Sequence, residues 1–179
     1  MMIRKFLPFL LLSLAGCALG LPYVRDVTTQ DEVIARQGPP AYVVEGNKGE
    51  QRLFWPSGPM GTSTIMARFD AHQRLLAYEE VLDTEHFSNI QAGMSTDEVL
   101  REIGPPWAPW TVFYASRNEL NWEWRYCDSW GEAARFTVLF DGTSKKVRST
   151  LSLTETQRFG VRTSGCGHVY IPKLQSLQP

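Results

Sequence analysis

The sequence predicts an α+β protein of two tandem units, each a short helical segment packed on a three- to four-stranded antiparallel meander. Three observations lead to this prediction. One helix signature occurs twice, short segments with a two-residue hydrophobic period follow each copy, and turn residues separate those segments. Self-similarity at a fixed spacing indicates a repeated supersecondary unit. We therefore expect one unit at residues 24–82 and another at 88–153, followed by a C-terminal tail at 154–179.

The second copy of the helix signature is the better specified one. Ser95 and Glu98 have the spacing of a capping box, in which the serine hydroxyl and the glutamate carboxylate satisfy two backbone N–H groups at the helix start. Met94 and Val99 occupy the two positions of a hydrophobic staple. Gly104, followed by two prolines, ends the pattern, because glycine adopts the positive φ that a helix end requires and proline cannot continue a helix. The sequence predicts a helix that begins after Ser95 and ends before Gly104.

The first copy lies at residues 29–40 and aligns with the second without a gap. Thr29 and Glu32 keep the capping box, and Gly38 with two prolines repeats the ending. Gln37 stands where the second copy has the apolar Ile103. We expect this first helix to be the less well specified of the two.

Alternating residues predict the strands that follow each helix. In the second unit, the segment 120–126 places Trp122 and Trp124 on one face, and Asn121 and Glu123 on the other. Asp141-Gly142 is a dipeptide favoured in hairpin turns. Val147, Leu151 and Leu153 are expected to share one side of the last strand. The expected strands are 41–44, 52–55, 65–69, 75–81, 120–126, 135–140 and 147–153.

The N-terminal segment has the pattern of a secretory signal. Residues 1–16 carry two basic residues and then an apolar run that is too short to span a bilayer after processing. The segment ends in Leu14-Ala15-Gly16-Cys17, which resembles a bacterial lipobox and implies lipidation of Cys17, with residues 17–23 as a tether. Ala18, with no aspartate at that position, resembles the pattern of outer-membrane targeting. The alternative is a plain signal peptide with an incidental cysteine.

Composition and cysteine count exclude several classes of function. The 179-residue chain has a formal net charge of −1 and no basic segment, which argues against a nucleic-acid partner. Beyond Cys17 it contains only Cys127 and Cys166. In an oxidising periplasm such a pair predicts one disulfide, with two buried free thiols as the alternative. No C-x₂-C spacing supports a metal site.

The lipobox, the capped segment Gly-Met-Ser-Thr-Asp-Glu-Val-Leu ending in Gly-Pro-Pro, and the strands after it resemble the BamE (SmpA/OmlA) family of lipoproteins. Those proteins are accessory subunits of the machine that assembles outer-membrane β-barrels. The resemblance covers residues 24–153, although BamE is similar to one such unit rather than two. The tandem arrangement is also similar to the β-lactamase inhibitor protein, which presents an aromatic-rich concave sheet to a protein partner. The resemblances imply a periplasm-facing accessory factor anchored in the outer membrane or, alternatively, an enzyme inhibitor.

No motif in the sequence predicts catalysis or a cofactor. His72, His86 and His168 occur without a nucleophile or metal-binding pattern around them, and the acidic residues at each helix start are what capping and the helix dipole favour. We expect a non-enzymatic protein, with no catalytic residues, no metal and no cofactor.

The excess of aromatic residues is the strongest indication of a binding surface. The chain has six tryptophans, and tryptophan is enriched at binding hot spots. Candidate partner-binding residues are those in loops near the second helix, those of the strand after it, and their counterparts in the first unit: Trp107, Trp110, Trp130, Trp122, Trp124, Phe54 and Trp55. The alternative for Trp122 and Trp124 is that they fill the space between sheet and helix. A membrane-surface role is the alternative for the loop residues.

Overall fold

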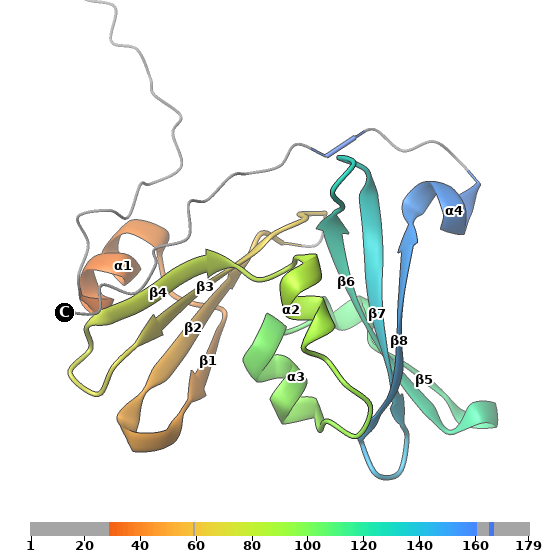
Figure 1. Cartoon of the computed structure of the whole chain (residues 1–179), viewed down its shortest axis with the longest axis horizontal. Coiled ribbons are helices and arrows are strands. Elements are labelled where there is room, and N and C mark those ends of the chain that lie inside the picture. The colour runs from red at the N-terminus through yellow and green to blue at the C-terminus, as the bar shows by residue number, and fades with distance from the viewer. Residues whose placement is uncertain (1–28, 59, 161–164, 167–179) are drawn as a thin grey trace, which may run out of the picture.

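The computed structural model describes residues 29–58, 60–160 and 165–166, and it is an α+β structure with two four-stranded antiparallel sheets (Figure 1). Both sheets are meanders with their strands in chain order, β1-β2-β3-β4 and β5-β6-β7-β8. The predicted class and the two antiparallel meanders are therefore confirmed. Cys17 and the tether lie outside the described residues.

The first sheet follows helix α1 in the chain, and the second follows helices α2 and α3. The first part consists of α1 (Gln30–Gln37), β1 (Tyr42–Glu45), β2 (Gln51–Pro56), β3 (Thr64–Phe69) and β4 (Leu75–Glu80). The second part consists of α2 (Thr84–Ser88), α3 (Thr96–Ile103), the 3₁₀ turn η2 (Ala108–Trp110), β5 (Val112–Tyr114), β6 (Glu119–Cys127), β7 (Ala133–Asp141), β8 (Val147–Thr154) and α4 (Glu155–Phe159).

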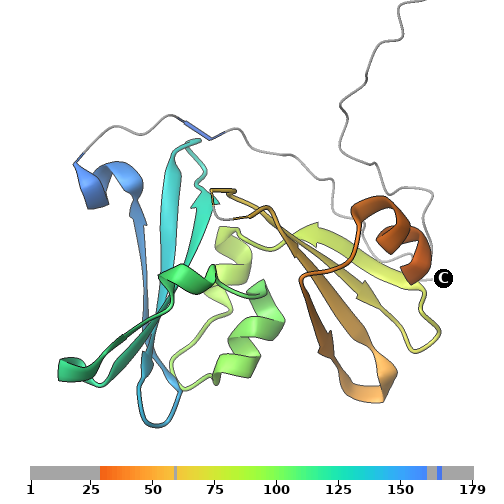
Figure 2. The ribbon, with the colours of Figure 1, turned by 180° about the vertical axis from the view of Figure 1, so that it is seen from behind.

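The elements stack in layers, with α1 on the outside of the first sheet and with α2 and α3 between the two sheets (Figures 1 and 2). Val33 of α1 packs in a buried cluster with the α1-facing side of the first sheet, at Leu53, Ala67, Phe69 and Tyr78. The opposite side of the same sheet buries Phe54 and Met66. Both faces of the first sheet are thus covered.

Helix α3 is held by both sheets. Its Val99 and Ile103 are fully buried in the core of the second sheet, beside Trp124 and Phe136. On its other side, the Arg52 Nη1 of the first sheet donates to a carbonyl oxygen of α3, that of Arg101, at 2.8 Å. The capping box at its start is present, with Glu98 bonded to the N-cap Ser95. The sequence pattern therefore locates the central helix of the molecule.

The two capped helices share details of geometry that were not evident in the sequence. Each N-cap residue forms an isolated bridge to the residue just before the last strand of the sheet that follows, Thr29 to Arg74 and Ser95 to Lys146. Each helix ends at a glycine with positive φ. Each third strand also has a register shift at its last phenylalanine, at Phe69 and at Phe140. Such matched irregularities agree with the repeated sequence pattern.

That register shift reverses one prediction. Val147 pairs with Phe140 and lies in the core, but after the shift Leu139 pairs with Ser149, so Leu151 and Leu153 pair with Thr137 and Arg135 on the opposite face. A bulge adds one residue to one strand, which changes the face that every later side chain takes. The expectation that all three apolar residues share one side is therefore wrong.

Two helices were missing from the sequence prediction. Helix α2 lies in the connector between the units, begins at the N-cap Asp83 and stacks Phe87 on Phe136 with ring centroids 3.9 Å apart. Helix α4 lies at the start of the predicted tail and has a capping box of Thr154 with Gln157. The T-x-x-Q spacing was a readable signal for the second of these.

Candidate functional site

Three of the seven candidate aromatic residues are part of the core. Phe54 is fully buried between the first sheet and α3, and Trp124 is 3% exposed on the α3 side of β6. Trp122 is half-buried on that same side, with its ring 4.8 Å from that of Phe140. Phe54 exposes no surface to a partner, which corrects its inclusion as a binding residue, and Trp124 is accessible only where it lines a cavity beside Trp107 and Trp110. The space-filling alternative holds for Trp122 and Trp124.

Trp55 lies in a different layer from Trp122. It is on the α1-facing side of the first sheet, where its indole Nε1 donates to the carbonyl oxygen of Gly38 at 3.0 Å. The second sheet, with Trp122, is separated from it by the first sheet and by α2 and α3 (Figure 1). The structure therefore does not bring Trp55 and Trp122 together in one patch, which is the arrangement expected of a tandem inhibitor.

The three loop tryptophans have three different environments. Trp130, in the β6–β7 turn, is 89% exposed, and Trp107 is 40% exposed. Trp110 is half-buried, and its ring lies 3.8 Å from the guanidinium carbon of Arg135. Trp107 and Trp110 also line a cavity of about 310 Å³ between the loop after α3 and the β2–β3 loop.

The face of the second sheet that points away from α3 carries the more distinctive surface. Alternation along β6 and β7 places the apolar side chains toward α3 and the polar ones on this opposite face, which we call the outer face. A concave site of about 320 Å³ lies on it. It is lined by residues of β5, β6, β7, β8 and α4, including Tyr114, Asn121, Glu123, Arg135, Leu151 and Arg158. Among the described residues, α4 is the one helix on this face (Figures 1 and 2).

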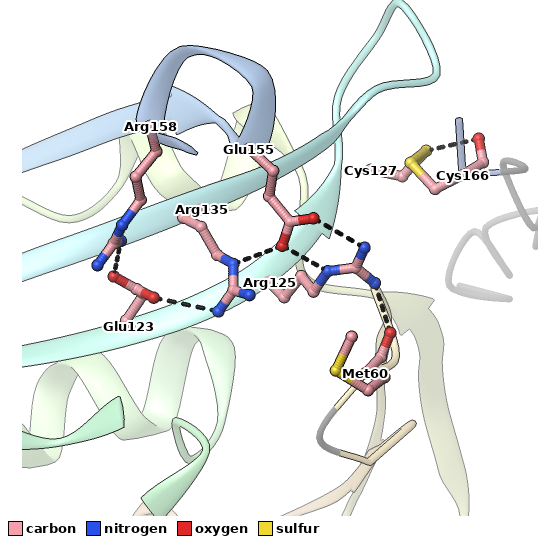
Figure 3. Close-up of polar contacts among 8 residues, drawn as sticks. All are labelled: Met60, Glu123, Arg125, Cys127, Arg135, Glu155, Arg158 and Cys166. Carbon is pink, nitrogen blue, oxygen red and sulfur yellow. Dashed lines mark hydrogen bonds and ion pairs between the residues drawn. A yellow bond between two sulfur atoms is a disulfide. The ribbon is translucent and has the colours of Figure 1, made fainter. Parts of the chain in front are cut away.

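A network of buried ion pairs forms the floor of the outer face (Figure 3). Glu155 of α4 accepts from Arg125 Nε and from Arg135 Nε, both at 2.7 Å. Glu123 accepts from Arg135 Nη1 at 3.1 Å and also from Arg158. The hydrogen bond from Arg125, with that from Arg135, lowers the pKa of Glu155 below its ordinary value despite its burial.

The same network joins parts of the chain that are distant in sequence. Arg125 donates through Nη1 to the carbonyl oxygen of Met60, in the β2–β3 loop of the first sheet (Figure 3). Arg135 is stacked on Trp110, which follows α3. The network therefore fixes the guanidinium planes on the outer face and connects them to the first sheet.

Asn121 lies among these charges, and its side-chain oxygen Oδ1 has no hydrogen-bond partner among the described residues. The residue is 9% exposed, lines the concave site, and its Oδ1 is buried. Buried side-chain oxygens in folded proteins are normally bonded, so Oδ1 of Asn121 leaves an unused acceptor beside the concave site.

A disulfide closes one end of the outer face. Cys127, at the end of β6, is bonded to Cys166, with their Cα atoms 5.7 Å apart. The Cys166 N–H also donates to the carbonyl oxygen of Gly131 at 2.9 Å. The predicted disulfide is confirmed, and it ties the chain after α4 to the β6–β7 turn.

Sequence reasoning missed the charged residues that form this site. Asn121, Glu123 and Arg125 alternate with the tryptophans of β6, so their shared face was readable from the two-residue period. Their partners Arg135 and Glu155 were not, because register and the position of α4 come from tertiary packing.

Of the histidines that the structure describes, the buried His86 is bonded within the fold. The pKa of His86 is lowered by burial but raised more by its hydrogen bond to Asp83 and by the nearby carboxylates, so that it lies above its ordinary value. Its Nδ1 lies 2.8 Å from Asp83 Oδ1. Within the described residues, no group of three or more His, Cys, Asp or Glu side chains is placed to hold a metal ion. No helix among those residues is long and apolar enough to cross a membrane.

Comparison with known proteins identifies no family. No protein-family model matches the chain, and no curated protein matches its sequence. One solved structure, an extracellular protein containing an SCP domain from Bacillus anthracis str. Ames, is 7% identical with a TM-score of 0.26. The similarity covers 86% of this chain and 50% of the other, so this chain spans half the length of that protein. A likeness at this TM-score carries no argument about fold or function.

Proposed function

We propose that the protein is a non-enzymatic lipoprotein, anchored in the outer membrane through Cys17 and facing the periplasm, that binds another protein during β-barrel assembly or maintenance of the envelope. We also propose that it consists of two copies of one helix-plus-meander unit. The signal segment with its lipobox supports the anchor. The capped helices with their matched bridges and bulges support the duplication.

The observation that carries the proposal is the outer face of the second sheet, on which α4 is the one α-helix among the described residues and a concave site remains open. A sheet in a small domain buries one face and solvates the other, and a solvated face usually carries separate polar side chains. This one is concave and rigidified by buried ion pairs. A preorganised concave surface reduces the cost of ordering side chains when a partner binds.

The rim of the outer face supplies apolar contact area. Strand β5 is an edge strand, paired only with β6, and its three residues Val112, Phe113 and Tyr114 are 37%, 52% and 40% exposed. A run of exposed apolar residues on a sheet edge marks an interaction site. Tyrosine and other aromatic residues are enriched at protein interfaces. The apolar rim and the charged floor together favour a protein partner.

Photocrosslinking in intact envelopes tests this proposal. A photoreactive residue at Tyr114 should capture a subunit of the β-barrel assembly machine or another envelope protein. The matched control is the same probe at Val43, which is 44% exposed on β1, the edge strand of the first sheet. Capture at Tyr114 but not at Val43 supports docking on the outer face. Capture of a soluble periplasmic enzyme would favour the inhibitor alternative, and equal capture at both positions would contradict a specific face.

The anchor is tested separately by metabolic labelling. The full chain should incorporate labelled palmitate and fractionate with outer membranes, and Cys17→Ser should abolish both results. Cys127→Ser, at the disulfide, is the control that keeps Cys17. Labelling that persists in Cys17→Ser would contradict the lipidation site.

A further inference from the structure

The concave site on the outer face has more cationic donors than its own carboxylates use. It is lined by three arginines and two glutamates. Both oxygens of Glu123 already accept hydrogen bonds, from Arg135 and Arg158, with Thr137 as a further donor. Glu119 is paired with Arg117 at 3.0 Å. The acidic groups of the site are therefore neutralised from within.

Two of the arginines that line the site keep N–H donors that bond to no described residue. Among the described residues, Arg117 and Arg158 each bond to a single carboxylate through one terminal nitrogen. A guanidinium carries five N–H donors, so most of each fork remains for a ligand. Arg135 is fixed in place by two carboxylates and by the ring of Trp110. A guanidinium group held in this way binds an anion without a further loss of side-chain entropy.

The remaining walls select against a simple inorganic anion. Three leucines, Leu139, Leu151 and Leu153, form one side of the site. Asn121, with its unpartnered Oδ1, lies on the floor and pairs with Leu139 in the β6–β7 register. An asparagine amide both donates and accepts, which matches the N–H and C=O groups of a peptide backbone. The volume of about 320 Å³ is at the lower end of the roughly 300–1,000 Å³ typical of ligand pockets.

We propose that this site is the specificity pocket of the docking face, and that it binds an acidic side chain next to an aliphatic residue in an extended segment of the protein partner. The acidic group pairs with Arg117 and Arg158, the aliphatic side chain packs on the leucine wall, and a backbone amide bonds to Asn121. This inference rests on the proposed function, because it specifies the chemistry of the same partner.

The test is a titration of the full-length chain, isotopically labelled in a non-ionic detergent, with the peptide N-acetyl-Leu-Asp-Leu-amide. The side-chain amide resonances of Asn121 report binding at the site directly. We expect them to shift with the Asp peptide, and we expect the matched Asn peptide to bind at least tenfold more weakly. Added salt should weaken binding of the Asp peptide and leave binding of the Asn peptide nearly unchanged.

Variants assign the effect to the site. Arg117→Gln and Arg158→Gln should each weaken the Asp peptide about tenfold, since each removes a charged hydrogen-bond donor. The control is Arg101→Gln, an exposed arginine on α3 outside the site, which should leave binding unchanged. Arg117 is exposed at its side chain, so its substitution preserves the fold, and Tm checks this.

Three results would overturn the inference. The first is equal binding of the Asp and Asn peptides. The second is an equal loss of affinity for the Asp peptide in Arg101→Gln and Arg117→Gln. The third is displacement of the Asp peptide by inorganic phosphate at equal concentration, which would indicate a site that binds any small anion. These outcomes are independent of the crosslinking at Tyr114. If Tyr114 captures a partner but the Asp peptide does not shift Asn121, the inference is wrong and the docking function stands. If Tyr114 captures nothing, the docking function itself fails.

Discussion

The two sheets follow one plan along the chain but differ in what covers them. Each has four antiparallel strands in chain order after a helix with a capping box and a glycine at its end. The first sheet has α1 on one face and α3 on the other, whereas the second has α3 on one face and, among the described α-helices, only the five-residue α4 on its outer face. The repeated unit therefore occupies two different environments.

The two sheets differ in the side chains on the face that points away from the capped helix preceding each sheet, which is α1 for the first and α3 for the second. In the first sheet that face buries the apolar Phe54 and Met66 beside the partly exposed Arg52. In the second it carries Glu123 and Arg135, both buried and paired. Buried ion pairs are weak contributors to stability, because the desolvation of the charges offsets much of their attraction. A sequence under selection for folding alone has little reason to place charges there, which favours a role for the outer face in recognition.

The glycines that end the two helices give the largest expected contrast. Gly104→Ala should lower the free energy of unfolding by about 4 kcal/mol, because φ there is +71° and an added Cβ would lie 2.8 Å from Phe54 Cδ1 in the contact between α3 and the first sheet. Gly38→Ala should cost about 2 kcal/mol, since φ of +82° with ψ of −177° is essentially restricted to glycine but no atom lies within 4 Å of the added Cβ. Urea unfolding of both variants measures the difference. Equal losses of unfolding free energy in the two variants would show that the end of α3 is not packed more tightly than the end of α1.

Glu155→Gln tests whether the outer face depends on its ion pairs. The variant leaves Arg125 and Arg135 without their shared carboxylate, so we expect a loss of about 3 kcal/mol at pH 7. Because the pKa of Glu155 is lowered in the folded state, this contribution is present above its ordinary pKa of 4.5 and is lost as pH falls through the lowered value. The unfolding free energies of wild type and variant should converge in acid. A difference that stays constant with pH would assign the loss to packing.

Glu80→Gln in the first sheet should raise the free energy of unfolding at high pH, whereas Glu155→Gln lowers it. Glu80 Oε1 accepts from the backbone N–H groups of Thr64 and Leu82, but its Oε2 is buried, and no described residue donates to it. Burial raises its pKa from 4.5 to about 7. The wild type should therefore lose stability as pH rises from about 4.5 to about 7, and at pH 8 the variant should be more stable by about 2 kcal/mol.

The pH series separates this effect from a packing change. At pH 5 wild type and Glu80→Gln should have nearly equal unfolding free energies, because Glu80 is then mostly protonated in the folded protein. Denaturant titrations at pH 5 and pH 8 measure both values. A variant that is less stable than wild type at pH 8 would mean that the carboxylate of Glu80 has a partner we have not identified.

Local signals in the sequence predicted the elements whose ends and faces are determined locally. Both capped helices and seven of the eight strands lie where capping residues and the two-residue period placed them. Strand β5 and helix α2 were missed, because β5 has three residues that are all exposed and α2 has only five. Segments of that length show no measurable periodicity.

Tertiary packing decided the candidate site, which is why the sequence predicted it poorly. Leu151 and Leu153 reach the outer face only because the β7–β8 register shifts by one residue, with Arg148 as the extra residue in β8. Arg135 becomes part of the site through α4 and Trp110, both distant in sequence. Of the three tryptophans in loops, which the sequence predicts to be exposed, Trp107 and Trp130 are exposed and Trp110 is half-buried against Arg135. Phe54 had no local signal of its burial.

Removing the two N-cap side chains should give the smallest changes in stability. The two variants should nevertheless differ clearly in how far the effect extends through the molecule. Ser95→Ala and Thr29→Ala each remove a side-chain hydrogen bond to the N3 backbone, worth about 1 kcal/mol. Because α3 contacts both sheets, Ser95→Ala should increase amide hydrogen exchange in both of them. Helix α1 contacts only the first sheet, so Thr29→Ala should increase exchange in α1 and leave the second sheet protected. Faster exchange throughout the second sheet in Thr29→Ala would mean that the outer cover of the first sheet also supports the docking face, and that the two units act as one cooperative body.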